Sequence, residues 1–444
     1  MMTLQKEGQE AFLAFLWELY GLVDGDDPLQ KIRAKAWDHF LSVGLPGPRN
    51  DVYRYVPLRK FFTRSYVGGE TVSVDPKAIE HLILPECAGS VVVFVNGRYQ
   101  AGLSRLTSLP SRLTVSSLSE AMRTYGSFLN NQWSKNLKDE ADPFALANAS
   151  LHRDGVFIYV APKTVLDHPI QILNVIDSGS QPMLIMPRVQ AFIGAQSEVK
   201  IVSTFGKLSG EGYAINMVAD ISLEDDAHVQ YVQESTGIGE GTWCFDALRS
   251  TLKRNSTLKS ISVNDGSVGL RLDYRASLNG ENAEALLNGV WMLSGKNESH
   301  THVLVDHQAP HCRSNQLFKG VVNDTSRSSF EGKILVRQAA QKTEAFQLNN
   351  NLLLSDRANA DSKPNLEIFA DDVKASHGST VGQLDAEQIF YMKTRGFSDA
   401  DAKNLLVYGY CQEVIEMIPI ESVKNRLMAA SRNYMSGENS RKEA

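Results

Sequence analysis

The spacing of apolar residues changes twice along the 444-residue chain. In about the first 150 residues, apolar positions such as Phe12, Leu16 and Leu19 recur at helical spacing, which predicts helices. Within this stretch an apolar run is followed by Asn96-Gly97, a pair typical of a tight β-hairpin turn. We therefore expect an N-terminal region, 1–150, of helices with a small mixed part.

From 151 to 382 helical spacing disappears and short β-branched runs alternate with polar corners. Several ten-residue units share one pattern: an aliphatic residue, three mostly polar residues, a small residue, then aliphatic residues at fixed offsets. The units begin about 26–30 residues apart, a period typical of stacked repeats, and are Ile193–Val202, Leu223–Val232, Leu252–Ile261 and Leu278–Leu287, the last with one residue inserted before its small residue Ala283. One coil cannot bury its own apolar face, so coils must stack. The pattern favours a parallel β-helix, and an antiparallel β-sandwich is the alternative.

The third region, 383–444, is predicted to be helical. Asp385 can cap a first helix, Gly396 is suited to the left-handed residue after it, and Ser398 can start a second helix. In this second helix the apolar positions that recur on one face are Leu406, Tyr410, Val414 and Met417. A third amphipathic helix follows, and the final residues form a polar tail.

Composition excludes several classes of protein. The chain is 43% hydrophobic and carries a net charge of −6, so it can build a core and has no basic footprint for nucleic acid. Acidic residues interrupt the N-terminal apolar stretch, and no run approaches the roughly 20 apolar residues that span a membrane. The four cysteines are far apart and form no C-x-x-C pair. We expect a cytoplasmic protein with reduced thiols that binds neither nucleic acid nor membrane.

Common catalytic motifs are missing from the sequence: it contains no phosphate-binding loop, no G-x-S-x-G and no H-E-x-x-H. One stretch is rich in potential metal ligands, namely His300, His302, His307, His311 and Cys312. These residues either bind a metal or occupy the outer faces and turns of coils, and the pattern leaves both interpretations open.

Three acidic residues suggest a different chemistry. Glu367, Asp371 and Asp372 could serve as the carboxylates of a β-helical carbohydrate-active enzyme. The corner of a β-helix produces the same residues without any function, and no aromatic-rich sugar groove is evident nearby.

The stretches NNNLLLSDRANADSKPNLEIFADDVKASHGSTVGQLDAEQIFYMKTRGFS and VDHQAPHCRSNQLFKGV closely resemble the SufD branch of the SufB/SufD family of iron–sulfur cluster assembly proteins. The resemblance covers most of the chain. It implies a right-handed parallel β-helix between helical regions, and a scaffold rather than an enzyme. It also implies pairing with a SufB-like paralogue through the β-helices, and docking of a SufC-like ATPase on the C-terminal helices.

The resemblance further implies functional positions. His377 matches an interface histidine that is a candidate iron or cluster ligand, whereas Ala375 stands where the family often has cysteine. A cluster or iron would be transient at the SufB interface, with no cofactor held stably by this chain alone. The candidate SufC-docking residues are Gln388, Tyr391, Lys393, Arg395, Gly396 and Phe397.

The alternatives at these positions are structural. His377 could be a hydrogen-bonding residue of an obligate interface, and the C-terminal helices could be buried against the β-helix instead. The exposed edge of a β-helix could also pair with a second copy of the chain, giving a homodimeric scaffold without a metal role.

Overall fold

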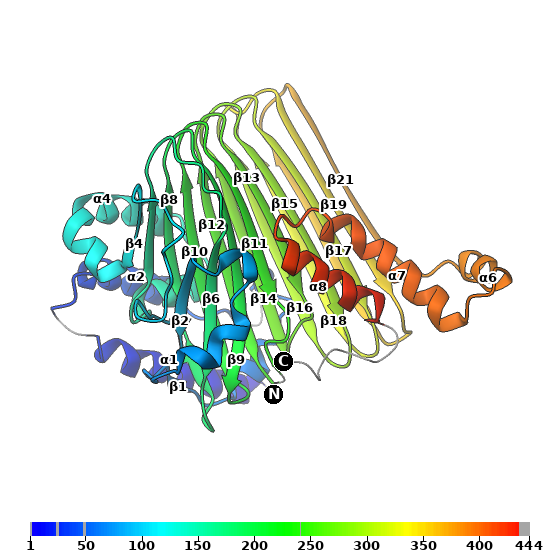
Figure 1. Ribbon diagram of the computed structural model, residues 1–444, viewed down its shortest axis with the longest axis horizontal. Helices are drawn as coiled ribbons and strands as arrows, with labels where there is room; N and C mark the ends of the chain where they lie inside the picture. The colour runs from blue at the N-terminus through cyan, green and yellow to red at the C-terminus, as the bar shows by residue number, and fades with distance from the viewer. Residues whose placement is uncertain (1, 24–25, 48–49, 240, 435–444) are drawn as a thin grey trace.

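The computed structural model describes residues 2–23, 26–47, 50–239 and 241–434, and these form a mainly β protein built on a parallel β-helix (Figure 1). Successive coils place alternate strands in two sheets. Sheet A has 11 strands: β1 (Val67–Gly68), β4 (Leu113–Ser117), β5 (Val156–Val160), β7 (Met183–Ile185), β8 (Arg188–Ile193), β10 (Ala214–Leu223), β12 (Trp243–Leu252), β14 (Gly269–Leu278), β16 (Glu298–His307), β18 (Arg327–Val336) and β20 (Asn359–Ile368).

Sheet B has 10 strands: β2 (Val91–Val95), β3 (Arg98–Tyr99), β6 (Ile170–Asp177), β9 (Glu198–Ser209), β11 (His228–Ser235), β13 (Thr257–Asn264), β15 (Glu284–Leu293), β17 (Arg313–Val322), β19 (Thr343–Leu353) and β21 (Val373–Gln383). Each of β10 to β21 pairs in parallel with the strand two positions away in sequence. The predicted β-helix is therefore confirmed, and the antiparallel β-sandwich is wrong.

The repeat found in the sequence is the corner between sheet A and sheet B. The small residue of each unit is buried at this corner, and the residue before it adopts a positive φ, as in Asp226 (59°) before Ala227 and Asn282 (59°) before Ala283. Backbone bonds link successive corners: the Asp226 amide donates to the Arg254 carbonyl at 2.8 Å. A small side chain lets the chain turn inward while the corners stack.

Helices cover the first coils and part of sheet B (Figure 1). They are α1 (Met2–Gly21), α2 (Gln30–Val43), η1 (Asp51–Tyr53), α3 (Leu58–Phe62), η2 (Pro76–Leu82), η3 (Pro85–Cys87), α4 (Leu118–Lys138), α5 (Pro143–Leu151), α6 (Ala386–Thr394), α7 (Asp399–Ile415) and α8 (Glu421–Arg432). The predicted hairpin is β2–β3, and β2 also pairs in parallel with β6. The N-terminal part of the chain thus contributes strands to both sheets.

The helix α7 packs on the outer face of sheet B. Tyr410 anchors it by donating its hydroxyl to the Asn350 carbonyl at 2.6 Å, and Lys319 of β17 donates to the Tyr410 carbonyl at 3.1 Å. Its buried side chains are Ala402, Val407, Cys411, Val414 and Ile415. The predicted face was wrong at its end, because α7 stops at Ile415 and Met417 is left 45% exposed.

Candidate functional site

The last coil leaves one end of the β-helix open. Strands β20 and β21 are each the final strand of their sheet, so each has a neighbour on one side only. Most residues of β21 are exposed, and the residues of β20 are at most half-buried. Long edge strands with free backbone groups are usually covered or blunted in stable proteins. Apolar side chains nonetheless remain exposed here, including Phe369 (62%) and Val381 (48%).

His377 lies near the middle of β21. In the register of the sheet it is opposite Gln347 of β19, whose side chain is buried, whereas the neighbouring Phe346 is 41% exposed on the outer face. Paired residues of in-register parallel strands point to the same side. His377 therefore belongs to the interior face of the open coil, and its imidazole is exposed because no further coil covers it.

Ala375 lies on the same face of β21 as His377, opposite Ala345. It packs beside the small apolar cluster that contains Ile334 and Ala345. The methyl group of Ala375 offers no metal ligand, so metal chemistry by this part of β21 rests on the imidazole of His377.

The helix α6 stands away from the β-helix, beyond the last coil (Figure 1). None of its residues is buried, and the exposed fractions of Phe390 and Tyr391 are 69% and 59%. Asp385 caps its first turn by accepting from the Glu387 amide at 2.8 Å, and Gly396 follows its end with a φ of 95°, as predicted.

The candidate docking residues group around α6 and the turn after it. Arg395 lies over the Tyr391 ring at 5.2 Å, Lys393 is 3.4 Å from Asp399, and Phe397 is 44% exposed. Gln388 is also exposed. The two helices are placed differently, since α7 packs against sheet B and α6 has no buried residue.

The first histidines of the ligand-rich stretch are held by neighbouring side chains. His300 and His302 are buried on the outer face of β16, where His300 bonds to Ser329 Oγ at 2.8 Å and His302 to Asp273 at 2.9 Å. Burial lowers the pKa of His300. Asp273 is also ion-paired with Arg249 at 2.8 Å, in a network that ties sheet A to the N-terminal helical region through Glu140.

The remaining members of the stretch occupy one corner. His307 points inward and bonds to Ser314 Oγ at 2.9 Å, and burial lowers its pKa to about 4. His311 is the positive-φ residue of the corner (φ 61°), and Cys312 is the small residue after it, fully buried with a thiol pKa raised to about 11 by burial. His311 is exposed outside the coil and Cys312 faces the core. Across the described ranges, no group of three or more His, Cys, Asp or Glu residues could hold a metal ion.

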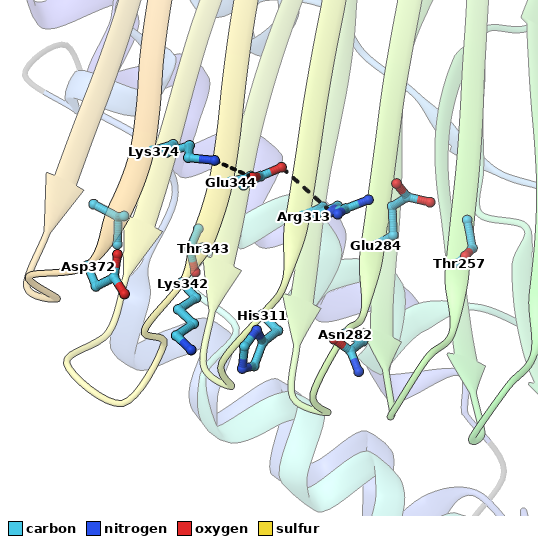
Figure 2. Close-up of a pocket in the computed structure, with 11 residues that line it drawn as sticks. Thr257, Asn282, Glu284, His311, Arg313, Lys342, Thr343, Glu344, Asp372 and Lys374 are labelled. Atoms are coloured by element: carbon cyan, nitrogen blue, oxygen red, sulfur yellow. Dashed lines mark hydrogen bonds and ion pairs between the residues drawn. The ribbon is translucent and has the colours of Figure 1, made fainter.

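A groove of about 570 Å³ runs along these corners on the outer side of sheet B (Figure 2). Its centre is a row of charges in which Glu344 pairs with Lys374 at 3.0 Å and with Arg313 at 3.7 Å. The groove is lined by Thr257, Asn282, Glu284, His311, Arg313, Lys342, Thr343, Glu344, Asp372, Val373 and Lys374. The lining holds equal numbers of carboxylates and of Lys and Arg side chains, so these groups give the groove no excess of one charge that would select a ligand.

Comparison with known proteins identifies the family. Residues 175–410 match the family described as SUF system FeS cluster assembly, SufBD core domain, and residues 24–172 match the SufBD protein N-terminal region. The chain belongs to the SufBD family of iron–sulfur cluster assembly proteins. The match to the core domain begins near the end of β6, includes all later strands to β21 and continues through α6 into α7.

Relatives extend over most of the chain. An iron–sulfur cluster assembly SufBD family protein of Synechocystis is 31% identical, covering 90% of each chain. The iron–sulfur cluster assembly protein SufD of Escherichia coli is 30% identical, covering 88% of this chain and 89% of its own. The chloroplastic protein ABCI7 of Arabidopsis thaliana is 26% identical over 92% and 86% of the two chains.

The sequence singled out His377 of this SufBD protein as a candidate ligand, but it did not reveal the surroundings of this residue. The exposed apolar residues Phe369, Val381 and Phe390 were not singled out. Gln347 was missed too, because only the register of β19 and β21 places it beside His377. In the part of the chain that the structure describes, no helix is long and apolar enough to cross a membrane.

Proposed function

We propose that this SufBD protein is a non-enzymatic scaffold subunit that pairs with a SufB-like paralogue through its last coil and docks a SufC-like ATPase on α6. The observation that carries the proposal is the open coil at the end of the β-helix. There the last strand, β21, has a free edge and exposed residues on both faces, and His377 lies near the middle of this strand. The names of the relatives support iron–sulfur cluster assembly as the process.

The open coil supports pairing with a partner. Strand edges present unpaired N–H and C=O groups, which a strand from another chain can satisfy. Exposed Val381 and Phe369 would supply apolar burial beside those hydrogen bonds. A second copy of this chain is the competing occupant in any pairing experiment.

At such an interface His377 would contribute one imidazole to transient iron or a nascent cluster. Imidazole nitrogen suits iron, and it is a neutral ligand that releases its cargo more readily than thiolate. A single imidazole cannot hold a cluster alone, so the remaining ligands would come from the partner. Iron and cluster are thus cargo and not cofactors resident in this chain.

The carbohydrate-active alternative has little support. Glu367 is ion-paired with Lys333 at 2.7 Å and Asp372 is exposed at a corner. The relatives that match most of the chain include proteins named for iron–sulfur cluster assembly.

Co-expression with a SufB-like and a SufC-like protein tests the proposal. A stable three-component complex, in which the ATPase rate of the SufC-like subunit differs from that of the free subunit, is the expected result. If this chain purifies alone or only as a homodimer, and the ATPase rate is unchanged, the proposed function is wrong.

We expect Tyr391→Asp to remove the SufC-like subunit from the complex and to leave the SufB-like subunit bound. Tyr391 is 59% exposed on a helix with no buried residue, so the charge would not disturb folding but would have to be buried on docking. Affinity for the SufC-like subunit should fall by at least about 100-fold, roughly 3 kcal/mol. Met417→Asp is the matched control, because Met417 is also exposed (45%) but lies past the far end of α7. Loss of the subunit with both variants would contradict docking on α6.

A further inference from the structure

The interior of the last coils is polar where that of the earlier coils is largely apolar. Gln316 of β17, Gln347 of β19 and His377 of β21 occupy one column, because the register places Gln316 opposite Gln347 and Gln347 opposite His377. Gln316 and Gln347 are buried, with exposed fractions of 0% and 3%. Buried amides of this kind need hydrogen-bond partners.

The two amides form a ladder with a defined direction. Gln347 Nε2 donates to Gln316 Oε1 at 2.8 Å. Among the described residues, Gln316 Nε2 and Gln347 Oε1 are buried without a hydrogen-bond partner. The ladder thus leaves one donor unused on Gln316 and one acceptor unused on Gln347, the member of the pair that lies next to β21.

The backbone makes room for this arrangement. Gly332 of β18 faces Gln347, and a Cβ at Gly332 would lie 2.1 Å from Gln347 Nε2. Any larger residue at Gly332 would push the amide out of place. The position of Gln347 is therefore built into the coil, and the next residue in its column is His377.

We propose that Gln347 is a positioning residue for His377: its Oε1 accepts a hydrogen bond from one ring N–H of the imidazole. The contact is supported by the register, because neighbouring strands are about 4.8 Å apart and His377 is paired directly with Gln347 on the interior face. The bond fixes the neutral tautomer and leaves the other ring nitrogen free. Where that nitrogen binds iron, as in the proposed function on which this inference rests, Gln347 orients the ligand as outer-shell partners of metal-bound histidines do.

The tautomer of His377 tests the inference directly. The full-length chain labelled with 15N-histidine is examined by long-range 1H–15N NMR at a pH where an ordinary imidazole is neutral, and the His377 signal is assigned by its loss in His377→Ala. The wild type should show a single tautomer. Gln347→Met removes the acceptor with little change in volume and should give a mixture of both tautomers.

Two further variants separate positioning from general damage. Gln347→Glu keeps an oxygen acceptor at the same place and should retain the single tautomer. Asn349→Leu removes another buried amide of β19, two residues away and opposite Ser379, and should leave His377 unchanged. The inference is overturned if wild type and Gln347→Met show the same mixture, or if Asn349→Leu changes the tautomer as much as Gln347→Met does.

Iron retention by the three-component complex distinguishes this inference from the proposed function. Gln347→Met should weaken iron binding by on the order of 10-fold, the usual effect of losing an outer-shell partner. If His377→Ala leaves iron binding unchanged while the tautomer depends on Gln347, the contact exists and the proposed metal role fails. If His377→Ala abolishes iron binding but Gln347→Met changes neither the tautomer nor iron binding, the metal role of His377 stands and the positioning role of Gln347 fails.

Discussion

Val381→Glu abolishes copurification of this chain with a SufB-like partner while leaving the isolated chain folded. Val381 is 48% exposed on the last strand, so a carboxylate there is solvated in the free chain. Pairing of β21 with another strand would bury that charge without a partner, which costs several kcal/mol. We expect affinity to fall by at least about 1,000-fold, roughly 4 kcal/mol, in a quantitative pull-down or by calorimetry.

A matched control is available at the other end of the molecule. Leu22 is 65% exposed next to α1, and Leu22→Asp introduces the same kind of charge far from the last coil. The control should keep wild-type affinity. Binding of Val381→Glu at wild-type strength would show that the last coil is not the interface.

Replacing Asp246 by asparagine stabilises the protein at alkaline pH. Asp246 lies on β12 between inward-facing Cys244 and Leu248, it is 2% exposed, and among the described residues its carboxyl oxygens have no hydrogen-bond partner. Burial raises its pKa from 3.8 to about 7, and nearby Gln233 only partly opposes the shift. Asp246 is therefore a buried carboxyl that is costly to ionise.

The pH dependence follows from the raised pKa. Between pH 4 and 7 the folded state holds a proton on Asp246 that the unfolded state has lost, so the free energy of unfolding decreases as the pH rises through this window. The pKa of Asp246 is 3.8 in the unfolded state and about 7 in the folded state. Each pKa unit corresponds to about 1.4 kcal/mol, so the free energy of unfolding falls by on the order of 4 kcal/mol across this window.

Urea unfolding of Asp246→Asn and wild type at several pH values measures this effect. The variant should gain several kcal/mol relative to wild type at pH 8, and the difference should shrink toward pH 5. Asp225→Asn, at an exposed corner carboxyl 3.4 Å from Arg254, should change stability by less than about 1 kcal/mol at either pH. If the free energies of unfolding of Asp246→Asn and wild type differ by the same amount at every pH, the pKa of Asp246 is not raised by burial.

The β-helix could be predicted from the sequence because every corner between its sheets needs the same kind of residue at the same place. A small residue such as Ala227 must be buried where the chain turns, and that requirement survives wide variation elsewhere. The same pattern could have explained Cys312. The segment HQAPHCRSNQ matches LNGENAEALL position by position, with Cys312 in the place of Ala283, and the structure pairs the following residues Arg313 and Glu284.

The surroundings of His377 could not be predicted, because they depend on register and on which coil is last. Hydrophobic pattern alone does not reveal that β21 has no neighbour on its outer side, or that Gln347 is the next residue in the interior column. The sequence also did not reveal that α7 packs on sheet B whereas α6 stays exposed. Both helices carry apolar residues, and only their position relative to sheet B decides that Cys411 is buried and Phe390 is exposed.

The most direct test of the central claim compares wild type and His377→Ala in the complex with the SufB-like and SufC-like subunits. Iron and acid-labile sulfide are measured per complex after anaerobic purification, and the subunit ratio is checked in the same sample. His377 is exposed on the last strand, so its replacement should leave folding and subunit ratio unchanged. We predict an intact complex with at least a several-fold loss of iron and sulfide. An intact complex with wild-type iron and sulfide would contradict the metal-binding role of His377.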